Sequence, residues 1–180
     1  MSDPIIIVPY KAEWRDDFLH IGLNLRAALG NIALRIDHIG STSIVGLDAK
    51  PVIDIQVSVK SLEPMNYKPL IESIGYIHKV ENPDKTKRYF RESKSMRRTH
   101  IHVRELGSWS EQFALLFRDY LREHPNDCKK YAEVKYKLME LYSKERERYV
   151  EEKSPIIWEI IKKASQWSQY TGWKPGETDI

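Results

Sequence analysis

The feature that most limits how this chain can fold is the alternating run from Val52 to Val59. In an extended chain, successive side chains point to opposite faces. One face of the run would hold Ile53, Ile55, Val57 and Val59, and the other Val52, Asp54, Gln56 and Ser58. The run therefore predicts a strand with a hydrophobic core on one side and a functional site, marked by an acid, on the other.

The residues around this strand predict further strands and helices. Trp14, Phe18, Ile21, Leu25 and Leu29 recur at helical spacing and predict a helix from Ala12 to Leu29, which Gly30-Asn31 ends. Alternation predicts strands over residues 32–40, 76–81, 87–92 and 98–105, and a short helix is expected over 64–74. These elements indicate an α+β fold, a mixed β-sheet with flanking helices.

The pattern becomes helical after Gly107. Ser108 with Glu111 forms a capping-box pattern, and Pro125 is well placed to begin a long helix. We expect the last helix to begin at Ser154-Pro155 and the Gly- and Pro-containing residues 173–180 to be a loose tail. The predicted organisation is an α+β domain at 1–107, a C-terminal helical portion at 108–170 and a tail at 171–180.

Composition restricts the classes of function. The only cysteine is Cys128, so an intramolecular disulfide and a multi-cysteine zinc site are excluded. No apolar stretch is long enough to span a bilayer, and Met1 to Tyr10 lacks the basic region that a secretory leader carries before its apolar run, so we expect a cytoplasmic protein without membrane contact. The net charge of +3 is concentrated between Lys85 and Arg104, where eight basic residues accompany one acid.

Such a basic segment suits a polyanion, either a triphosphate or a nucleic acid, although it could also be a solvated surface loop. Nucleic acid is the less favoured partner, because no flanking Lys/Arg-rich tail accompanies the segment. The sequence leaves the oligomeric state open.

The most informative motif is His38-Ile-Gly-Ser-Thr-Ser, followed thirteen residues after Ser41 by Asp54. A Gly-Ser turn lets backbone N–H groups and a hydroxyl approach phosphate closely, because glycine has no Cβ. A neighbouring carboxylate can hold Mg²⁺ against the same phosphates. The alternative is an ordinary tight turn beside a polar strand residue.

Three stretches together resemble the GrpB-like family. The stretch His38 to Ile55 looks like its signature, and residues 87–91 leading into 98–103, and residues 117–125, follow in the expected order. The resemblance implies a nucleotidyltransferase-type fold and a domain that some bacteria fuse to dephospho-CoA kinase. No Walker A motif is present, so kinase activity of that type is not implied.

The wider nucleotidyltransferase pattern pairs Gly-Ser with Asp-x-Asp or Asp-x-Glu on the next strand. Gly40, Ser41 and Asp54 match it, whereas Gln56 stands where the second carboxylate should be. The resemblance therefore implies one Mg²⁺ bound through Asp54 and puts a two-metal arrangement in doubt.

Two sets of site residues follow. The expected catalytic residues are Asp54, which is also the metal ligand, Gln56, His100 and His102. The expected phosphate-binding residues are His38, Gly40, Ser41, Thr42, Lys50, Arg88, Arg91 and Arg98.

His100 and His102 lie two apart on a strand and so share a side. They could face phosphate, act as general acid and base, bind a transition metal with Asp54, or only hydrogen-bond within a polar sheet face. The leading expectation is metal-dependent nucleotidyl transfer from a nucleoside triphosphate to a small acceptor. The alternative is a non-catalytic module of the same fold that binds a nucleotide or a CoA-like ligand.

Overall fold

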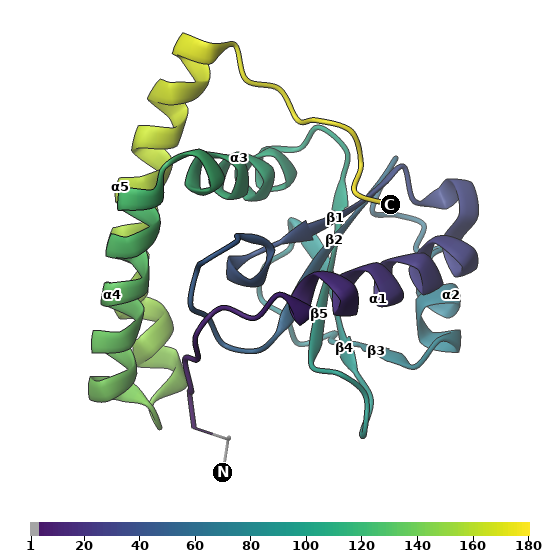
Figure 1. The fold of residues 1–180 in the computed structure, drawn as a ribbon. Helices are drawn as coiled ribbons and strands as arrows, with labels where there is room; N and C mark the ends of the chain where they lie inside the picture. Colours follow the sequence, from purple (N-terminus) through teal and green to yellow (C-terminus); the bar gives the residue numbers. More distant parts are fainter. Residues whose placement is uncertain (1–3) are drawn as a thin grey trace.

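The computed structural model describes residues 4–180 as a five-stranded sheet with helices on both faces (Figure 1). This mixed α+β architecture is the one that the sequence predicts. The helices and strands are α1 (Glu13–Leu29), β1 (Arg35–Ile39), β2 (Ile53–Val59), α2 (Lys68–Ser73), β3 (Tyr76–His78), β4 (Lys87–Glu92), β5 (Thr99–Glu105), α3 (Trp109–Glu123), α4 (Pro125–Tyr142) and α5 (Arg146–Thr171). Two short 3₁₀ turns, Gly30–Ile32 and Ser41–Ser43, flank β1.

The strands lie in the order β1-β2-β5-β4-β3, so the two central strands, β2 and β5, are distant in sequence. They pair in parallel, and every other pair is antiparallel. The parallel register places Asp54 beside His100 and Gln56 beside His102. Because paired residues project to the same side of a sheet, these four side chains share one face.

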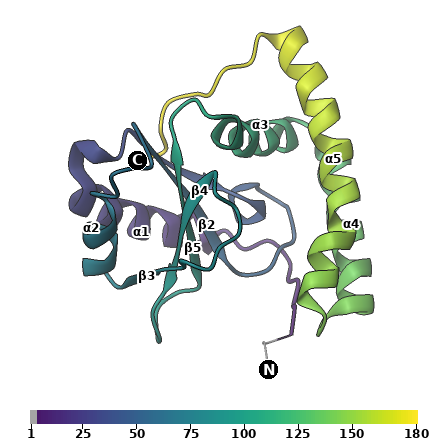
Figure 2. The ribbon, with the colours of Figure 1, turned by 180° about the vertical axis from the view of Figure 1, so that it is seen from behind.

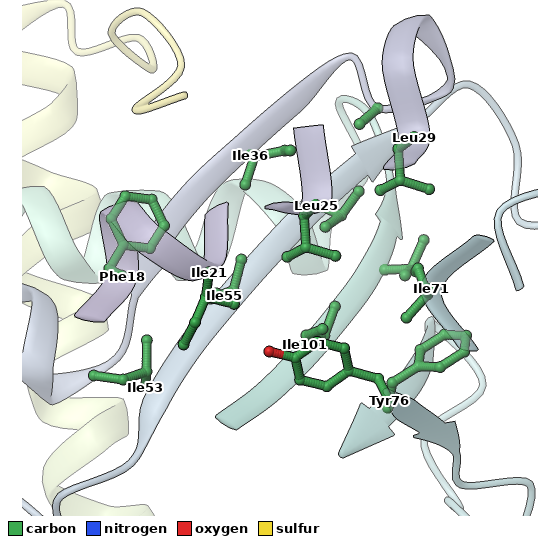
Figure 3. Close-up of a cluster of buried hydrophobic side chains, with 14 of the residues drawn as sticks. Phe18, Ile21, Leu25, Leu29, Ile36, Ile53, Ile55, Ile71, Tyr76 and Ile101 are labelled. Carbon is green, nitrogen blue, oxygen red and sulfur yellow. The ribbon is translucent and has the colours of Figure 1, made fainter. Parts of the chain in front are cut away.

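The opposite face of the sheet carries the main hydrophobic core. The predicted helix is confirmed as α1, whose apolar residues lie over β2 and β5 and over the neighbouring α2 (Figure 3). The five α1 residues with helical spacing are all buried: Trp14, Phe18, Ile21, Leu25 and Leu29. This layer fixes the strands on which the polar face depends.

Three predicted boundaries in the first part of the chain are wrong. β1 begins at Arg35 because the 3₁₀ turn continues to Ile32, which is partly exposed. The strand expected over 76–81 is only β3, and residues after His78 form a turn. The helix expected over 64–74 begins at Lys68.

The C-terminal helical portion consists of α3, α4 and α5 (Figure 2). Their buried side chains form a second core. The Ser108 hydroxyl accepts a bond from the Glu111 N–H, which confirms the predicted cap of α3. Ile44 and Leu47, from the loop between β1 and β2, are buried in this second core. The loop that follows the Gly-Ser turn is thus held by the helices.

The predicted start of the last helix is wrong, because Pro155 lies inside α5. An interior proline lacks an N–H and costs roughly 3 kcal/mol in a helix. Tyr149 and Ile156 are buried on either side of it, so packing against the rest of the protein outweighs the local preference.

The tail was expected to be loose, and this expectation is wrong. It leaves α5 and returns to β1, at the edge of the sheet (Figures 1 and 2). The Asp179 carboxylate accepts bonds from the His38 N–H at 2.9 Å and from Arg118 at 2.9 Å. The Ile180 N–H donates to the Ile36 carbonyl at 3.2 Å. These side-chain and terminal contacts could not be recognised from the Gly and Pro content of the segment.

Within residues 4–180, no helix combines the length and the hydrophobicity needed to cross a membrane.

Candidate functional site

The turn after β1 brings the chain against Asp54. Gly40 has a φ of +71°, in the region that favours glycine, and a Cβ there would lie 2.7 Å from Asp54 Oδ2. The Ser43 hydroxyl closes the turn by donating to the Gly40 carbonyl at 2.6 Å. Glycine is therefore required twice, by the backbone conformation and by the close approach of the carboxylate.

Two histidines from β5 meet the other oxygen of the same carboxylate. His100 Nδ1 lies 3.2 Å and His102 Nε2 lies 3.3 Å from Asp54 Oδ1. One ligand atom from each of the three residues lies within 4.8 Å of the others. The side chains are 28%, 17% and 13% exposed for Asp54, His100 and His102, so the cluster is partly shielded from solvent.

Electrostatics keep the Asp54 carboxyl of this cluster ionised. Burial alone would raise the pKa of Asp54, but hydrogen bonds from His100 and His102, and their charges, outweigh it and lower the pKa of that carboxyl. Burial lowers the pKa of His102 to about 4, although its hydrogen bond to Asp54 opposes the change. At neutral pH Asp54 is ionised and His102 is uncharged.

A cavity of about 250 Å³ opens beside Asp54 and His100. The Gly-Ser turn contributes Ser41 and Thr42 to its wall, and α4 and α5 contribute Lys135, Arg146, Tyr149, Val150 and Lys153. Its basic residues are Lys50, Lys135, Arg146 and Lys153. A cavity with four cations beside a Gly-Ser turn is suited to a polyanion.

Lys135 is the most enclosed of these cations, with 3% of the residue exposed. Its ammonium donates to the Ser41 hydroxyl at 3.2 Å and to the Asp48 carbonyl. Burial lowers its pKa to about 7, and burial likewise lowers the pKa of Lys50 to about 8. Both lysines therefore titrate near neutral pH, and a bound anion would favour their charged forms.

Tyr149 completes the wall between α5 and the loop. The residue is fully buried and its hydroxyl has no hydrogen-bond partner among residues 4–180. The Lys50 ammonium lies 4.8 Å from the centre of its ring. Tyr149 thus leaves a buried hydroxyl without a partner at the wall of the cavity.

The sequence reasoning missed Lys135, Arg146 and Lys153, because charges along helices usually mark a solvated face. One signal could have found Lys135. It lies four residues after Tyr131 and three before Leu138, on the buried side of α4. A lysine in an apolar stripe needs a polar partner or a ligand.

Some of the predicted phosphate-binding residues support the turn itself. His38 is 5% exposed, stacks on Phe18 with ring centres 4.6 Å apart, and bonds through Nε2 to the Thr42 hydroxyl at 3.0 Å. That hydroxyl donates to the Val52 carbonyl. Burial lowers the pKa of His38 to about 3, so the ring is neutral and cannot offer phosphate a charge.

Gln56 shares the polar face with Asp54 but is not brought into the cavity. It is fully buried beneath α3. Its amide donates to the Glu111 carbonyl at 3.2 Å and accepts from Arg104 at 2.6 Å. Both contacts are within the protein, so Gln56 is placed to hold α3 on the sheet.

The three arginines predicted to bind phosphate lie in different places. Arg88 pairs with Val103 in the register, on the core side of β4, and forms an ion pair with Glu63 at 2.8 Å. Arg91 shares the polar face with His100 but pairs with Glu92 at 3.0 Å. Arg98 lines a neighbouring cavity of about 330 Å³, together with Lys50 and Arg146. The structure therefore brings Lys50 to the cavity and Arg98 next to it.

The donors of the cluster do not match the pair of metal ions that belongs to the wider nucleotidyltransferase pattern. A pair of Mg²⁺ ions requires several carboxylate oxygens and nearly octahedral geometry. Here one carboxylate is accompanied by two imidazoles, and Gln56 is engaged with Arg104. The cluster is a possible metal centre, but its donor set does not fit a Mg²⁺ pair.

Comparison with known proteins is consistent across sequence and structure. A family model described as "GrpB protein" matches residues 4–163. The chain is 34% identical to UPF0157 protein YqkA of Bacillus subtilis over 164 residues, which cover 91% of this chain and 48% of that protein. It is 33% identical to a dephospho-CoA kinase of Mycobacterium bovis, covering 96% of this chain and 49% of the kinase. The chain thus spans about half the length of these two relatives.

Among solved structures, the GrpB protein of Enterococcus faecalis superposes with a TM-score of 0.81 at 31% identity, over 90% of this chain and 99% of that one. Cid1 in complex with the UTP analogue UMPNPP superposes with a TM-score of 0.51 at 13% identity, over 77% of this chain and 43% of Cid1. At that identity the second likeness concerns the fold alone.

Proposed function

Since the chain belongs to the GrpB family and shares its fold with nucleotidyltransferases, we propose that it binds a nucleoside triphosphate beside Asp54 and transfers the nucleotidyl group to a small acceptor. The observation that carries this proposal is the cavity in which the Gly-Ser turn meets four cations. We further propose that the protein acts in the cytoplasm.

The cavity matches the charge of a triphosphate. Lys50 comes from the loop before β2, Lys135 from α4, and Arg146 and Lys153 from α5. Ser41 can offer its hydroxyl, because that oxygen already lies 3.2 Å from the Lys135 ammonium and can accept from it while donating to phosphate. These groups would hold the triphosphate and orient it toward Asp54.

In the transfer, an acceptor hydroxyl gives up its proton to water and its oxygen forms a bond to the α-phosphorus, while the bond from that phosphorus to the bridging oxygen breaks to release pyrophosphate. Negative charge grows on the leaving group, where preorganised cations are most effective. Lys50, Lys135, Arg146 and Lys153 would supply this stabilisation. No step is assigned to Mg²⁺, because Asp54 is the one carboxylate of the cluster and is accompanied by two imidazoles, whereas Mg²⁺ takes oxygen ligands.

Free nucleic acid is a poorer partner. The basic segment from Lys85 to Arg104 does not form one positive face, because Arg88 and Arg91 form ion pairs and Arg97 pairs with Asp17 at 2.9 Å. Charges already paired within the protein contribute little to the neutralisation of phosphates.

A second candidate function is a module that binds a nucleotide or a CoA-like ligand without catalysis. The burial of Gln56 favours it, because the position that carries the second carboxylate in the wider family is used here to hold α3.

Calorimetry with the four nucleoside triphosphates, and pyrophosphate release with a panel of small acceptors, would test the proposal. We expect Lys153→Ala to weaken nucleotide binding by about 1.5–3 kcal/mol, the range for hydrogen bonds to charged groups. Lys144→Ala removes an exposed lysine near the α4–α5 turn and should have no effect.

The outcomes separate the candidates. Nucleotide binding with pyrophosphate release supports transfer, and binding without release in any acceptor mixture supports the module. If no nucleotide binds, or if Lys153→Ala and Lys144→Ala behave alike, the cavity is not a triphosphate site.

A further inference from the structure

We infer that Asp54, His100 and His102 form a binding site for a single first-row transition-metal dication, of the Zn²⁺, Fe²⁺ or Cu²⁺ class, and not for Mg²⁺. This inference refines the proposed function, and rests on it for the role of the ion in nucleotidyl transfer. The binding of the ion itself can be measured without nucleotide.

The geometry of the three side chains supports a shared ion. Typical Zn–N and Zn–O bonds of roughly 2.0–2.1 Å place neighbouring ligand atoms of a tetrahedral site about 3.3 Å apart. His100 Nδ1 and His102 Nε2 lie 3.2 and 3.3 Å from Asp54 Oδ1. The distances from Asp54 Oδ1 to the two histidine nitrogens therefore already equal the separation between ligand atoms in a tetrahedral metal site.

The backbone holds the three donors in this arrangement. Asp54 pairs with His100 in the parallel register of β2 and β5, and His102 follows on the same side. The Tyr89 ring, on the adjacent β4, packs against both imidazoles with ring centres 5.5 and 5.3 Å away. Asp54 Oδ2 is confined by Gly40, which leaves Oδ1 as the oxygen directed at the histidines.

The identity of the donors selects the class of metal. Imidazole nitrogen suits Zn²⁺, Fe²⁺ and Cu²⁺, whereas Mg²⁺ takes oxygen ligands and gives up its water reluctantly. Two imidazoles and one carboxylate, with Asp54 and His100 bordering the cavity, form a three-donor site that has an open side. Such a site keeps a position for water or substrate, as catalytic zinc sites do.

Each imidazole also retains a buried nitrogen that nothing satisfies. His100 Nε2 and His102 Nδ1 have no hydrogen-bond partner among residues 4–180. Leaving a buried polar atom unpaired costs about 1–3 kcal/mol. Ligation through His100 Nδ1 and His102 Nε2 would place the proton of each ring on the other nitrogen, so an ion at Asp54 fixes the tautomer of both rings but does not supply the missing partner. Within the described part of the chain, no other group of three such ligands converges.

The test uses the full chain without an affinity tag, stripped of metal with a chelator. Calorimetric titration with ZnCl₂, MnCl₂ and MgCl₂ would measure stoichiometry and affinity, and the visible absorption of bound Co²⁺ would report nitrogen ligation. We expect one Zn²⁺ per chain and an affinity for Mg²⁺ at least about 100-fold weaker, because the site offers two imidazoles.

Variants identify the ligands. His100→Ala and His102→Ala should each weaken Zn²⁺ binding by about 100-fold or more and remove the Co²⁺ absorption, since each loses one of three ligands. His20→Ala removes an exposed histidine on α1 and should change neither. If an alanine variant does not fold, His100→Gln and His102→Gln keep most of the side-chain volume and serve the same purpose.

The inference is overturned if Mg²⁺ displaces Zn²⁺ at equal concentration, or if folded variants at positions 100 and 102 bind Zn²⁺ like the parent. Its failure is distinct from failure of the proposed function. Nucleotide binding that persists without tight Zn²⁺ binding removes only the metal assignment, and tight Zn²⁺ binding in a protein that binds no nucleotide removes only the nucleotide assignment.

Discussion

At the scale of single residues, Gly40 is constrained both by its backbone conformation and by the nearby Asp54 carboxylate. Its φ of +71° disfavours any side chain, and a Cβ would lie 2.7 Å from Asp54 Oδ2. We expect Gly40→Ala to destabilise the protein by about 1–3 kcal/mol, from strain and crowding, and to weaken ligand binding at Asp54. Urea unfolding and calorimetry would measure the two effects.

Gly46 provides the matched control. Its φ is +79°, but a Cβ there would meet nothing within 4 Å. Gly46→Ala should therefore carry the strain without the displacement of Asp54. Equal losses of ligand binding in the two variants would show that the contact between Gly40 and Asp54 has no part in the site.

Lys135 makes a prediction about pH. Its pKa is lowered by burial to about 7, from 10.5 for a free lysine, so it carries charge fully only below neutral pH. Nucleotide affinity should fall as the pH rises from 6 to 9, first through the pKa of Lys135 and then through that of Lys50 at about 8. The free energy of unfolding should instead rise with pH between pH 7 and about 10.5. In that range Lys135 is protonated in the unfolded chain and has lost its proton in the folded one.

Calorimetry across this range would check the affinity. Lys135→Arg keeps its charge at every pH in the range, so the decline should begin later, near the pKa of Lys50. An affinity that is constant between pH 6 and pH 9 in the parent would contradict the assignment of these lysines to the ligand.

At the scale of elements, the segment after α5 acts as an edge cover for β1. Asp179 accepts from the His38 N–H and from Arg118, whose side chain is only 4% exposed. We expect Asp179→Ala to lower the free energy of unfolding by about 1–3 kcal/mol, because it leaves a nearly buried cation with one partner fewer. Thermal and urea unfolding would measure this.

Glu177 offers a control in the same segment, because only its carbonyl takes part, accepting from Arg35 at 3.1 Å. Glu177→Ala should leave stability within about 0.5 kcal/mol of the parent, as is usual for exposed substitutions. If both variants are equally stable, the segment does not support the sheet.

The elements that could be predicted were those with a periodic signal of their own. α1, β2 and β5 follow from hydrophobic spacing, and the predicted boundaries of α1 differ from the observed ones by one residue. The uninterrupted α5 and the docked tail could not be predicted, because Pro155 and the residues near Asp179 are held by contacts with distant parts of the chain. Local preference carries no information about such contacts.

The same distinction applies to the candidate site, of which only the residues on strands with a periodic signal could be predicted. Asp54, His100 and His102 lie on strands whose alternation fixes their side, so their meeting needs only the correct pairing of β2 with β5. The cations from α4 and α5 required knowledge of how the helices pack on the sheet. A catalytic role for Gln56 required its amide to be open to a ligand, whereas α3 covers it.

At the scale of the whole molecule, the two hydrophobic cores are joined through the functional loop. Ile44 and Leu47 belong to the core of the helices, although the loop that carries them continues from the turn at Gly40 into the sheet. Arg118 of α3 also donates to the His38 carbonyl at 3.1 Å. The division that the sequence predicts at residue 107 is therefore crossed by several contacts.

We accordingly expect the protein to unfold in one cooperative transition. Native-state hydrogen exchange should give the same limiting free energy for the central residues of α1 and of α5. A lower free energy for α5, unchanged by Leu47→Ala, would indicate that the helical portion opens independently.

The parallel pairing of β2 with β5 also determines when the site can exist during folding. Asp54 and its histidine partners are 46 and 48 positions apart in the chain, and two antiparallel strands are made between them. Closing so long a loop is slow and contributes to a high contact order, whereas hairpins and helices form from nearby residues. A folding intermediate can thus contain α1 and the β3–β4 hairpin and still lack every feature of the site. The moment at which ligand binding appears during refolding would therefore report when β5 pairs with β2.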